Sequence, residues 1–354
     1  MDRYTVIISD FGKHDRGYRG TKTFWSLASI FGAYAELGLY WFLIRYFGRS
    51  AVTLLRPSQL LSGPKVPDTD WLFVGLPTSI TKEHLRRINY RRLVLYDSTD
   101  QHEVFFVDSD QATLLSETDI VLKNFRDRRW NFPYRIGFLP IKRPPLNNRL
   151  SMAITVKKWT NGLGRDPRRR YDVGFVARPT GTVETNQRLR WMVELKRERS
   201  NLSLWGGLVG DTNWRRSFES HPDAKTLENC WLHCKKVSFF KYFSGLCESK
   251  VALAPSGYAP WSYRHFEAIY AGCMVVSNDL SNYEFLIPFP RETMVEVPDG
   301  ESVVPSIDKA LSMRETNPEI IEHNLRYLDR WLDKAHYSAD CPDTLDRFMA
   351  ELTN

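Results

Sequence analysis

Residues that could bind a phosphate group gather in one stretch of the chain, Ser249 to Val276, which reads SKVALAPSGYAPWSYRHFEAIYAGCMVV. Gly257 precedes a helical pattern that extends from about Trp261 to Ala271. The free N–H groups and positive dipole end of such a helix favour phosphate. Arg264 lies in the first turn, and Glu267 follows on the same face, where its carboxylate can accept hydrogen bonds from ribose hydroxyls. An ordinary surface ion pair between Arg264 and Glu267 is the alternative interpretation of this spacing.

The flanking residues predict the elements that position this helix. Val251–Ala254 is an apolar run of the length of a buried strand, and Pro255–Gly257 forms a turn after it. Gly272 stands where the helix ends, in the C′ position that glycine occupies without strain. Met274–Ser277 has the composition of the next buried strand. The stretch is therefore predicted to be a βαβ unit of a parallel sheet.

The same stretch resembles the C-terminal core of the exostosin-like glycosyltransferases. The resemblance covers about 28 residues and rests on a recurring order of residues, here Pro255 and Gly257, Ser262 and Arg264, Glu267 to Ile269, and Gly272 with Cys273. It implies a GT-B fold, in which the C-terminal half binds a nucleotide sugar, and an inverting reaction. Ser256 replaces the family's usual small or basic residue, so one phosphate contact made by a side chain in some relatives could be absent. The residues assigned to the donor site are Arg178, Ser256, Gly257, Tyr258, Ser262, Arg264 and Glu267.

Length and composition predict a folded protein of two domains. The chain has 354 residues, of which 42% are hydrophobic and 26% charged. Its net charge of +7 favours an anionic partner without choosing among a nucleotide sugar, an acidic glycan, an anionic lipid or nucleic acid. Five cysteines, an odd number, indicate free thiols in a reducing compartment. Because the chain opens with MDRYTVIISD, which has the pattern of a strand, we expect no signal peptide and a cytoplasmic location.

One apolar segment, Phe24 to Phe47, is long enough to cross a bilayer. Glu36 lies at its middle, where a charge costs roughly 2.5–3.5 kcal/mol on insertion scales. We therefore predict a helix buried against a sheet, with peripheral contact to a membrane surface as the alternative.

The rest of the chain alternates strand and helix patterns, which predicts an α/β, doubly wound architecture. We expect a Rossmann-like domain over 1–150 that binds the acceptor, and a second over 151–320 that binds the donor. A basic, proline-rich linker separates these halves, and helices over 321–354 are expected to cross back to the first domain. The predicted strands are Tyr4–Ile8, Val52–Leu55, Trp71–Val74, Arg92–Tyr96, Ile120–Leu122, Arg135–Leu139, Tyr171–Ala177, Leu202–Trp205 and Val295–Val297, with a glycine-bearing loop at Gly206–Gly210.

An inverting reaction needs a general base on the acceptor side. Asp10 and Asp97 each stand at the end of a predicted strand, and Asp100 lies a turn further on. These three carboxylates are the candidates. Acidic residues in such loops are also common helix caps and turn formers.

No cofactor or metal is expected, because a helix dipole and basic side chains can neutralise a leaving diphosphate. Asp108–Ser109–Asp110 matches a bare D-x-D pattern but is interpreted as a loop, and Cys230, His233 and Cys234 lack a second ligand pair at zinc-finger spacing.

The leading hypothesis is transfer of a sugar from a nucleotide-sugar donor to a hydroxyl of a glycan or lipid-linked glycan, in polysaccharide or glycoconjugate synthesis, with no nucleic-acid partner. A retaining GT-B transferase is the alternative enzyme, because Glu267 also matches the ribose-binding glutamate of retaining families. The alternative to an enzyme is a noncatalytic protein of the same fold that binds polyanions or glycans.

Overall fold

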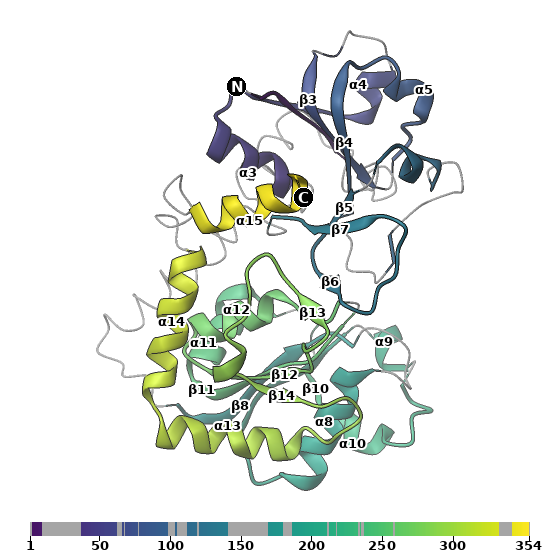
Figure 1. Ribbon diagram of the computed structural model, residues 1–354. Helices are drawn as coiled ribbons and strands as arrows, with labels where there is room; N and C mark the ends of the chain where they lie inside the picture. Colours follow the sequence, from purple (N-terminus) through teal and green to yellow (C-terminus); the bar gives the residue numbers. More distant parts are fainter. Residues whose placement is uncertain are drawn as a thin grey trace. The chain divides into compact units, whose positions relative to one another are not determined.

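The structure is a computed structural model, and its chain divides into two compact units (Figure 1). Unit 1 comprises Met1–Asn148, Asn282–Pro288 and Trp331–Asn354, and unit 2 comprises Arg149–Ser281 and Phe289–Arg330. The residues that the structure describes are 2–8, 37–61, 66, 68–76, 78–97, 103–104, 112–118, 120–140, 169–179, 186–210, 212–216, 218–232, 234, 237–257, 259–332 and 342–353.

Unit 1 is built on a six-stranded parallel sheet in the order β2-β1-β3-β4-β5-β7. The strands are β1 (Tyr4–Ile7), β2 (Val52–Leu55), β3 (Thr69–Leu76), β4 (Tyr90–Asp97), β5 (Ile120–Lys123) and β7 (Arg135–Phe138). The described helices that precede or join them are α3 (Leu37–Phe47), α4 (Pro57–Leu61), α5 (Lys82–Leu85) and the 3-10 helix η2 (Thr113–Glu117). Phe73 and Val74 are adjacent on β3, so their side chains point to opposite faces, and both are fully buried, as expected for a strand covered on both faces.

Two segments from late in the sequence complete unit 1. β13 (Tyr283–Glu284) pairs antiparallel with β6 (Arg126–Asp127), and Arg126 forms an ion pair with Glu284 at 2.6 Å. The C-terminal helix α15 (Pro342–Thr353), drawn in yellow in Figure 1, packs on β7, and its Phe348 meets Phe42 of α3 edge-on at 4.9 Å. The structure thus differs from the predicted division at residues 282–288, which lie in unit 1 although they fall within 151–320.

Unit 2 contains the second parallel sheet, in the order β10-β9-β8-β11-β12-β14. Its strands are β8 (Tyr171–Ala177), β9 (Leu204–Val209), β10 (Trp231–Leu232), β11 (Ser249–Ala254), β12 (Met274–Asn278) and β14 (Val295–Val297). The helices are α8 (Gln187–Glu198), α9 (Thr212–Arg216), α10 (Ala224–Glu228), α11 (Phe239–Cys247), α12 (Tyr263–Tyr270), η3 (Arg291–Thr293), α13 (Val304–Thr316) and α14 (Glu319–Leu332), whose last residues pass into unit 1. Counted from β8, the strand order is 3-2-1-4-5-6, which is the order of a Rossmann fold.

The predicted βαβ unit is present in unit 2 as β11, α12 and β12, with β11 and β12 parallel neighbours. Gly272 has φ +75° and follows the C-cap Ala271, as its place in the sequence predicts. Arg169 donates to the carbonyl of Ala271 at 2.9 Å and to that of Ser249 at 2.9 Å. Because the guanidinium ties down backbone carbonyls, Arg169 has a structural role.

One strand was misplaced by the sequence interpretation. β9 spans Leu204–Val209, whereas the sequence predicts a strand over Leu202–Trp205 and a loop over Gly206–Gly210. Gly206 and Gly207 lie inside the strand with φ values of +101° and +150°. A Cβ at Gly206 would lie 2.0 Å from the carbonyl oxygen of Phe175 on β8, so these glycines allow two strands to approach closely.

The helix predicted over Phe24–Phe47 is described only from Leu37, as α3, and residues 24–36 lie outside the described part. Leu39, Phe42 and Leu43 are buried in unit 1. Among the described residues, no helix combines the length and the apolar character needed to span a membrane.

Candidate functional site

The topological switch point of the unit 2 sheet lies between β8 and β11, since the chain winds outward in opposite directions from these two strands. In open α/β sheets, ligands bind outside the carboxyl ends of the strands at this point. Arg178 directly follows β8, and Ser256 and Gly257 follow β11 in the loop that leads to α12. Four of the residues assigned to the donor site from sequence, Arg178, Ser256, Gly257 and Arg264, therefore come together at one edge of the sheet.

The loop after β11 is held by the first turn of α8. Gln187 Oε1 accepts hydrogen bonds from the backbone N–H and the hydroxyl of Ser256, at 2.7 and 2.8 Å. Arg188 donates from Nε to the carbonyl of Ser256 at 3.1 Å and from Nη1 to the carbonyl of Arg178 at 2.7 Å. One arginine thus joins the two chain segments that leave the sheet at the switch point, and this fixes their geometry.

Arg264, in the first turn of α12, extends toward the carboxyl end of β8. Its Nη2 donates to the carbonyl of Val176 at 2.9 Å, and its guanidinium lies 5.6 Å from the ring centre of Phe175. Nε and Nη1 are buried and make no hydrogen bond among the residues that the structure describes. A buried guanidinium with unused donors at the end of a parallel sheet is suited to an oxyanion.

Glu267, one turn along α12, is only 6% exposed, so the alternative of a surface ion pair with Arg264 is wrong. The hydroxyl of Tyr242, on α11, lies beside both Glu267 and Arg264. Burial raises the pKa of Tyr242 well above its usual range, Glu267 raises it further, and Arg264 partly offsets the rise. Tyr242 therefore stays protonated and offers a neutral hydroxyl between the acidic and basic side chains.

The N-terminus of α12 has an unused hydroxyl and a neutral histidine. Ser262, the N-cap, has a buried Oγ without a hydrogen bond in the described structure. His265 is fully buried, with Nε2 2.8 Å from Ser277 Oγ and Nδ1 3.2 Å from the backbone nitrogen of Ser262. Burial lowers the pKa of His265 to about 4, and the charge of Arg264 contributes in the same direction. Because the imidazole is neutral at pH 7, it fixes the helix end without adding charge there.

Of the three predicted catalytic carboxylates, only Asp97 lies in the described part of unit 1. Its Oδ2 is 2.7 Å from Nζ of Lys123, and both side chains have zero exposure. The two residues are cross-strand neighbours at the ends of β4 and β5. A carboxylate enclosed with a lysine in this way cannot reach a substrate hydroxyl in this conformation, so its geometry favours a structural role.

The remaining predicted residues Asp10, Asp100 and Tyr258, together with His233 and the loop Asp108–Asp110, lie outside the described residues. Within the described part, no group of three His, Cys, Asp or Glu side chains is arranged to hold a metal ion. Cys230 is buried, its thiol donates to the carbonyl of Thr226 at 3.2 Å, and burial raises its pKa to about 11. This thiol packs as an ordinary core side chain.

The sequence interpretation missed three residues of the site. Gln187 and Arg188 open α8, but no spacing in the sequence connects them to Ser256, which is 68 residues or more away. Tyr242 has the sequence context of a core residue in an aromatic helix, and the structure places its hydroxyl beside Glu267. Only Gln187 could have been found from the sequence, because it is a polar residue in the first turn of the helix that follows β8, a strand of the switch point.

No family model matches this sequence, and no curated protein matches it. Solved structures do match along almost the whole chain. The N-terminal domain of trehalose-6-phosphate phosphatase from Candida albicans is 10% identical, with 98% of this chain and 97% of that chain covered and a TM-score of 0.57. A glycosyltransferase from Rickettsia africae is 10% identical, with complete coverage of both chains and a TM-score of 0.53. An OtsA structure is 14% identical, with 97% of this chain and 81% of that one covered, and also scores 0.53.

At these identities the likeness concerns the fold. Together with the two parallel sheets, it shows that the chain has the GT-B fold of glycosyltransferases, with two Rossmann-like domains. The predicted fold class is confirmed.

Proposed function

We propose that this protein is a glycosyltransferase that moves a sugar from a nucleotide-sugar donor to a hydroxyl of a glycan or lipid-linked glycan. The proposal rests mainly on Arg264, whose Nε and Nη1 are buried at the switch point of the unit 2 sheet and make no hydrogen bond to any described residue. This is where a Rossmann fold binds a nucleotide. Arg264 would bind the diphosphate, and Glu267 would accept hydrogen bonds from the ribose.

In the proposed mechanism the acceptor oxygen attacks the anomeric carbon while the bond from that carbon to the diphosphate oxygen breaks. A general base takes the hydroxyl proton, and the leaving diphosphate keeps the electron pair of the broken bond. The positive end of α12 and Arg264 stabilise the developing charge, so the reaction is proposed to proceed without a metal ion. Since the geometry of Asp97 favours a structural role, Asp10 and Asp100 are the proposed sources of the base.

An inverting reaction and membership of the exostosin-like group rest on the resemblance of residues 249–276. The buried position of Glu267 agrees equally with a retaining enzyme, in which a glutamate at this place also holds the ribose. The anomeric configuration of the product, measured by NMR, separates the two mechanisms. An inverted anomeric centre supports the proposal, and a retained one overturns its inverting step.

The enzyme test is release of nucleoside diphosphate from a panel of nucleotide sugars by the full chain, with glycan acceptors and with EDTA present throughout. We expect turnover with one donor, and a loss of roughly 10²-fold in Asp10→Asn or Asp100→Asn with donor affinity kept. Turnover that requires an added divalent ion would contradict the metal-free mechanism. Binding of sulfated or phosphorylated glycans without any turnover would instead identify a noncatalytic glycan-binding protein.

A further inference from the structure

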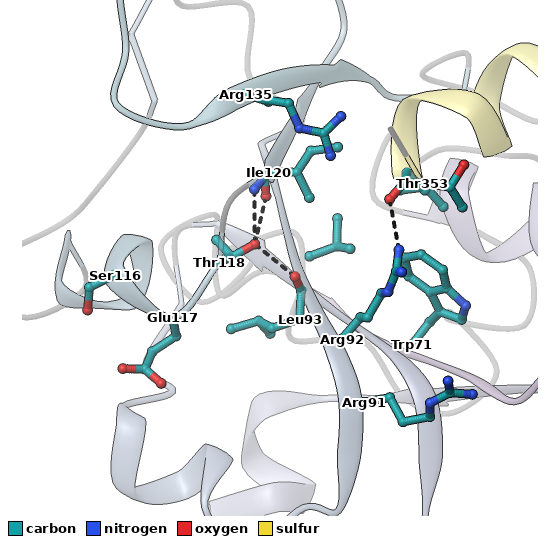
Figure 2. Close-up of a pocket in the computed structure, with 12 residues that line it drawn as sticks. Trp71, Arg91, Arg92, Leu93, Ser116, Glu117, Thr118, Ile120, Arg135 and Thr353 are labelled. Carbon is teal, nitrogen blue, oxygen red and sulfur yellow. Dashed lines mark hydrogen bonds between the residues drawn. The ribbon is translucent and has the colours of Figure 1, made fainter.

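A cavity of about 620 Å³ opens in unit 1 at the amino ends of its strands, the edge opposite Asp97 at the carboxyl end of β4. Figure 2 shows its lining, which comes from the starts of β3, β4, β5 and β7, from the residues just before β5, and from the end of α15. A cavity of this size lies within the roughly 300–1,000 Å³ typical of small-molecule sites. All of these segments belong to unit 1.

The register of the sheet places two arginines on the same face inside this cavity. Arg135 on β7 pairs with Ile120 on β5, and the register of β4 with β5 sets Val94 opposite Ile120. Arg92 precedes Val94 by two residues, and side chains two apart share a face. Neighbouring strands lie about 4.8 Å apart and each residue advances about 3.3 Å along a strand, so the two arginines, two strands and two residues apart, begin roughly 12 Å from each other. Figure 2 shows both side chains reaching toward the end of α15 at Thr353.

These arginines lack carboxylate partners in the described structure. Arg135 makes no hydrogen bond or ion pair there, and Arg92 contacts only the ring of Trp71, at 5.0 Å, and the carbonyl of Leu352, at 3.4 Å. Two positive charges thus face one cavity, and neither is paired with a described carboxylate.

Three carboxylates in or beside the lining already have other partners. Asp2 Oδ2 accepts from the indole N–H of Trp71 at 3.3 Å. Glu117 forms an ion pair with Lys82 at 2.9 Å. Asp70 accepts from the backbone nitrogen of Arg3 at 2.9 Å and contacts Arg91 at 3.4 Å. Because none of these acids is paired with Arg92 or Arg135, the cavity favours an anion that comes from solution.

We propose that this cavity binds a small anionic saccharide, with a phosphate or carboxylate group held between Arg92 and Arg135. The volume exceeds what an inorganic anion fills, so the anion is carried on a larger body. That body is proposed to be polyhydroxylated, because the rim carries the oxygens of Ser116, Glu117, Thr118 and Thr353, which already have protein partners but keep lone pairs that can accept from sugar hydroxyls. Trp71, Leu93, Val94, Ile120 and Leu352 supply the apolar part of the lining. The site is independent of the proposed donor site, which is built from residues of unit 2.

The test is titration calorimetry of the full chain with glucose 6-phosphate, glucuronate, glucose and inorganic phosphate. We expect one of the two charged sugars to bind at least about tenfold more tightly than glucose or inorganic phosphate. Arg135→Gln removes charge-assisted hydrogen bonds and should weaken this binding by about tenfold or more. Arg92→Gln should do the same, and Arg135→Lys, which retains the charge, should restore part of the affinity.

Two matched controls keep the result specific. Arg86→Gln changes an exposed arginine of unit 1 outside the cavity, and Arg264→Gln changes the proposed donor site, so neither should alter the binding of the charged sugar. The proposal is overturned if wild type binds neither charged sugar, if inorganic phosphate binds equally well, or if both Arg135→Gln and Arg92→Gln keep wild-type affinity. Loss of binding in Arg264→Gln alone would place the sugar at the donor site and also overturn it.

Discussion

Gln187 Oε1 accepts two hydrogen bonds from Ser256, one from its backbone nitrogen at 2.7 Å and one from its hydroxyl at 2.8 Å. Ser256 stands in the loop of the phosphate site predicted from sequence, yet both of its donors are already used within the protein. Its role is therefore to hold the loop in place, and in the proposed donor site the phosphate contacts are assigned to Arg264 and the N-terminus of α12.

Removing this acceptor should loosen the loop. We expect Gln187→Ala to lower the free energy of unfolding by about 1–3 kcal/mol, because two donors of Ser256 lose their partner. Gln187→Glu keeps an acceptor at the same place and should cost less. Both values come from denaturant titration followed by fluorescence, and equal stabilities for the alanine and glutamate variants would contradict the assigned role.

The buried pair of Lys123 and Asp97 should behave as a structural unit. Lys123→Met leaves a buried carboxylate without its cation and should cost about 3–5 kcal/mol of stability. The double variant Lys123→Met, Asp97→Leu should recover much of this loss, since it removes both charges. A double-mutant cycle measures the coupling energy. Simple additivity of the two single changes would show that the ion pair is not a unit.

His265 makes stability depend on pH. Its pKa is lowered to about 4 in the folded protein, against about 6.5 when unfolded, so the unfolded chain binds the extra proton between these values. The contribution of the neutral ring to the free energy of unfolding is complete above pH 6.5. It is lost as the pH falls toward 4, and the loss amounts to at most about 3 kcal/mol. Denaturant titrations at pH 7, 6 and 5 should show this slope in wild type. His265→Asn should flatten the slope, and an unchanged slope would place the titrating group elsewhere.

The C-terminal helix should stabilise unit 1. Phe348 is fully buried against Phe42, so Phe348→Ala is expected to cost about 3–5 kcal/mol. Asp346→Ala changes an exposed residue of the same helix and should stay within about 0.5 kcal/mol of wild type. Urea titration measures both variants. A cost for Phe348→Ala as small as that of Asp346→Ala would mean that α15 is not docked on unit 1.

Local patterns predicted much of the fold, because they depend on neighbours in the sequence. The strand–loop–helix–strand order around α12, the glycine at Gly272 and the repeated α/β rhythm all follow from periodicity and turn residues. Contacts between distant segments could not be predicted in this way. The carboxylate of Asp97 has the sequence context of a loop acid, and only the pairing of β4 with β5 sets it against Lys123. Likewise, glycines that normally indicate a loop lie within β9, because the neighbouring carbonyl of Phe175 leaves no room for a Cβ.

The donor site at the switch point of unit 2 is tested most directly by calorimetric titration of wild type, Arg264→Gln and Glu267→Gln with UDP, GDP, ADP and CDP. Arg216→Gln serves as the control, since Arg216 is an exposed arginine of the same unit outside the site. Wild type and the control should bind one of the nucleotides with equal affinity. Each site variant should remain folded and bind that nucleotide more weakly by about 1.5–3 kcal/mol, because it loses charge-assisted hydrogen bonds. Unchanged affinity in both site variants, or no nucleotide binding by wild type, would contradict the assignment of this site.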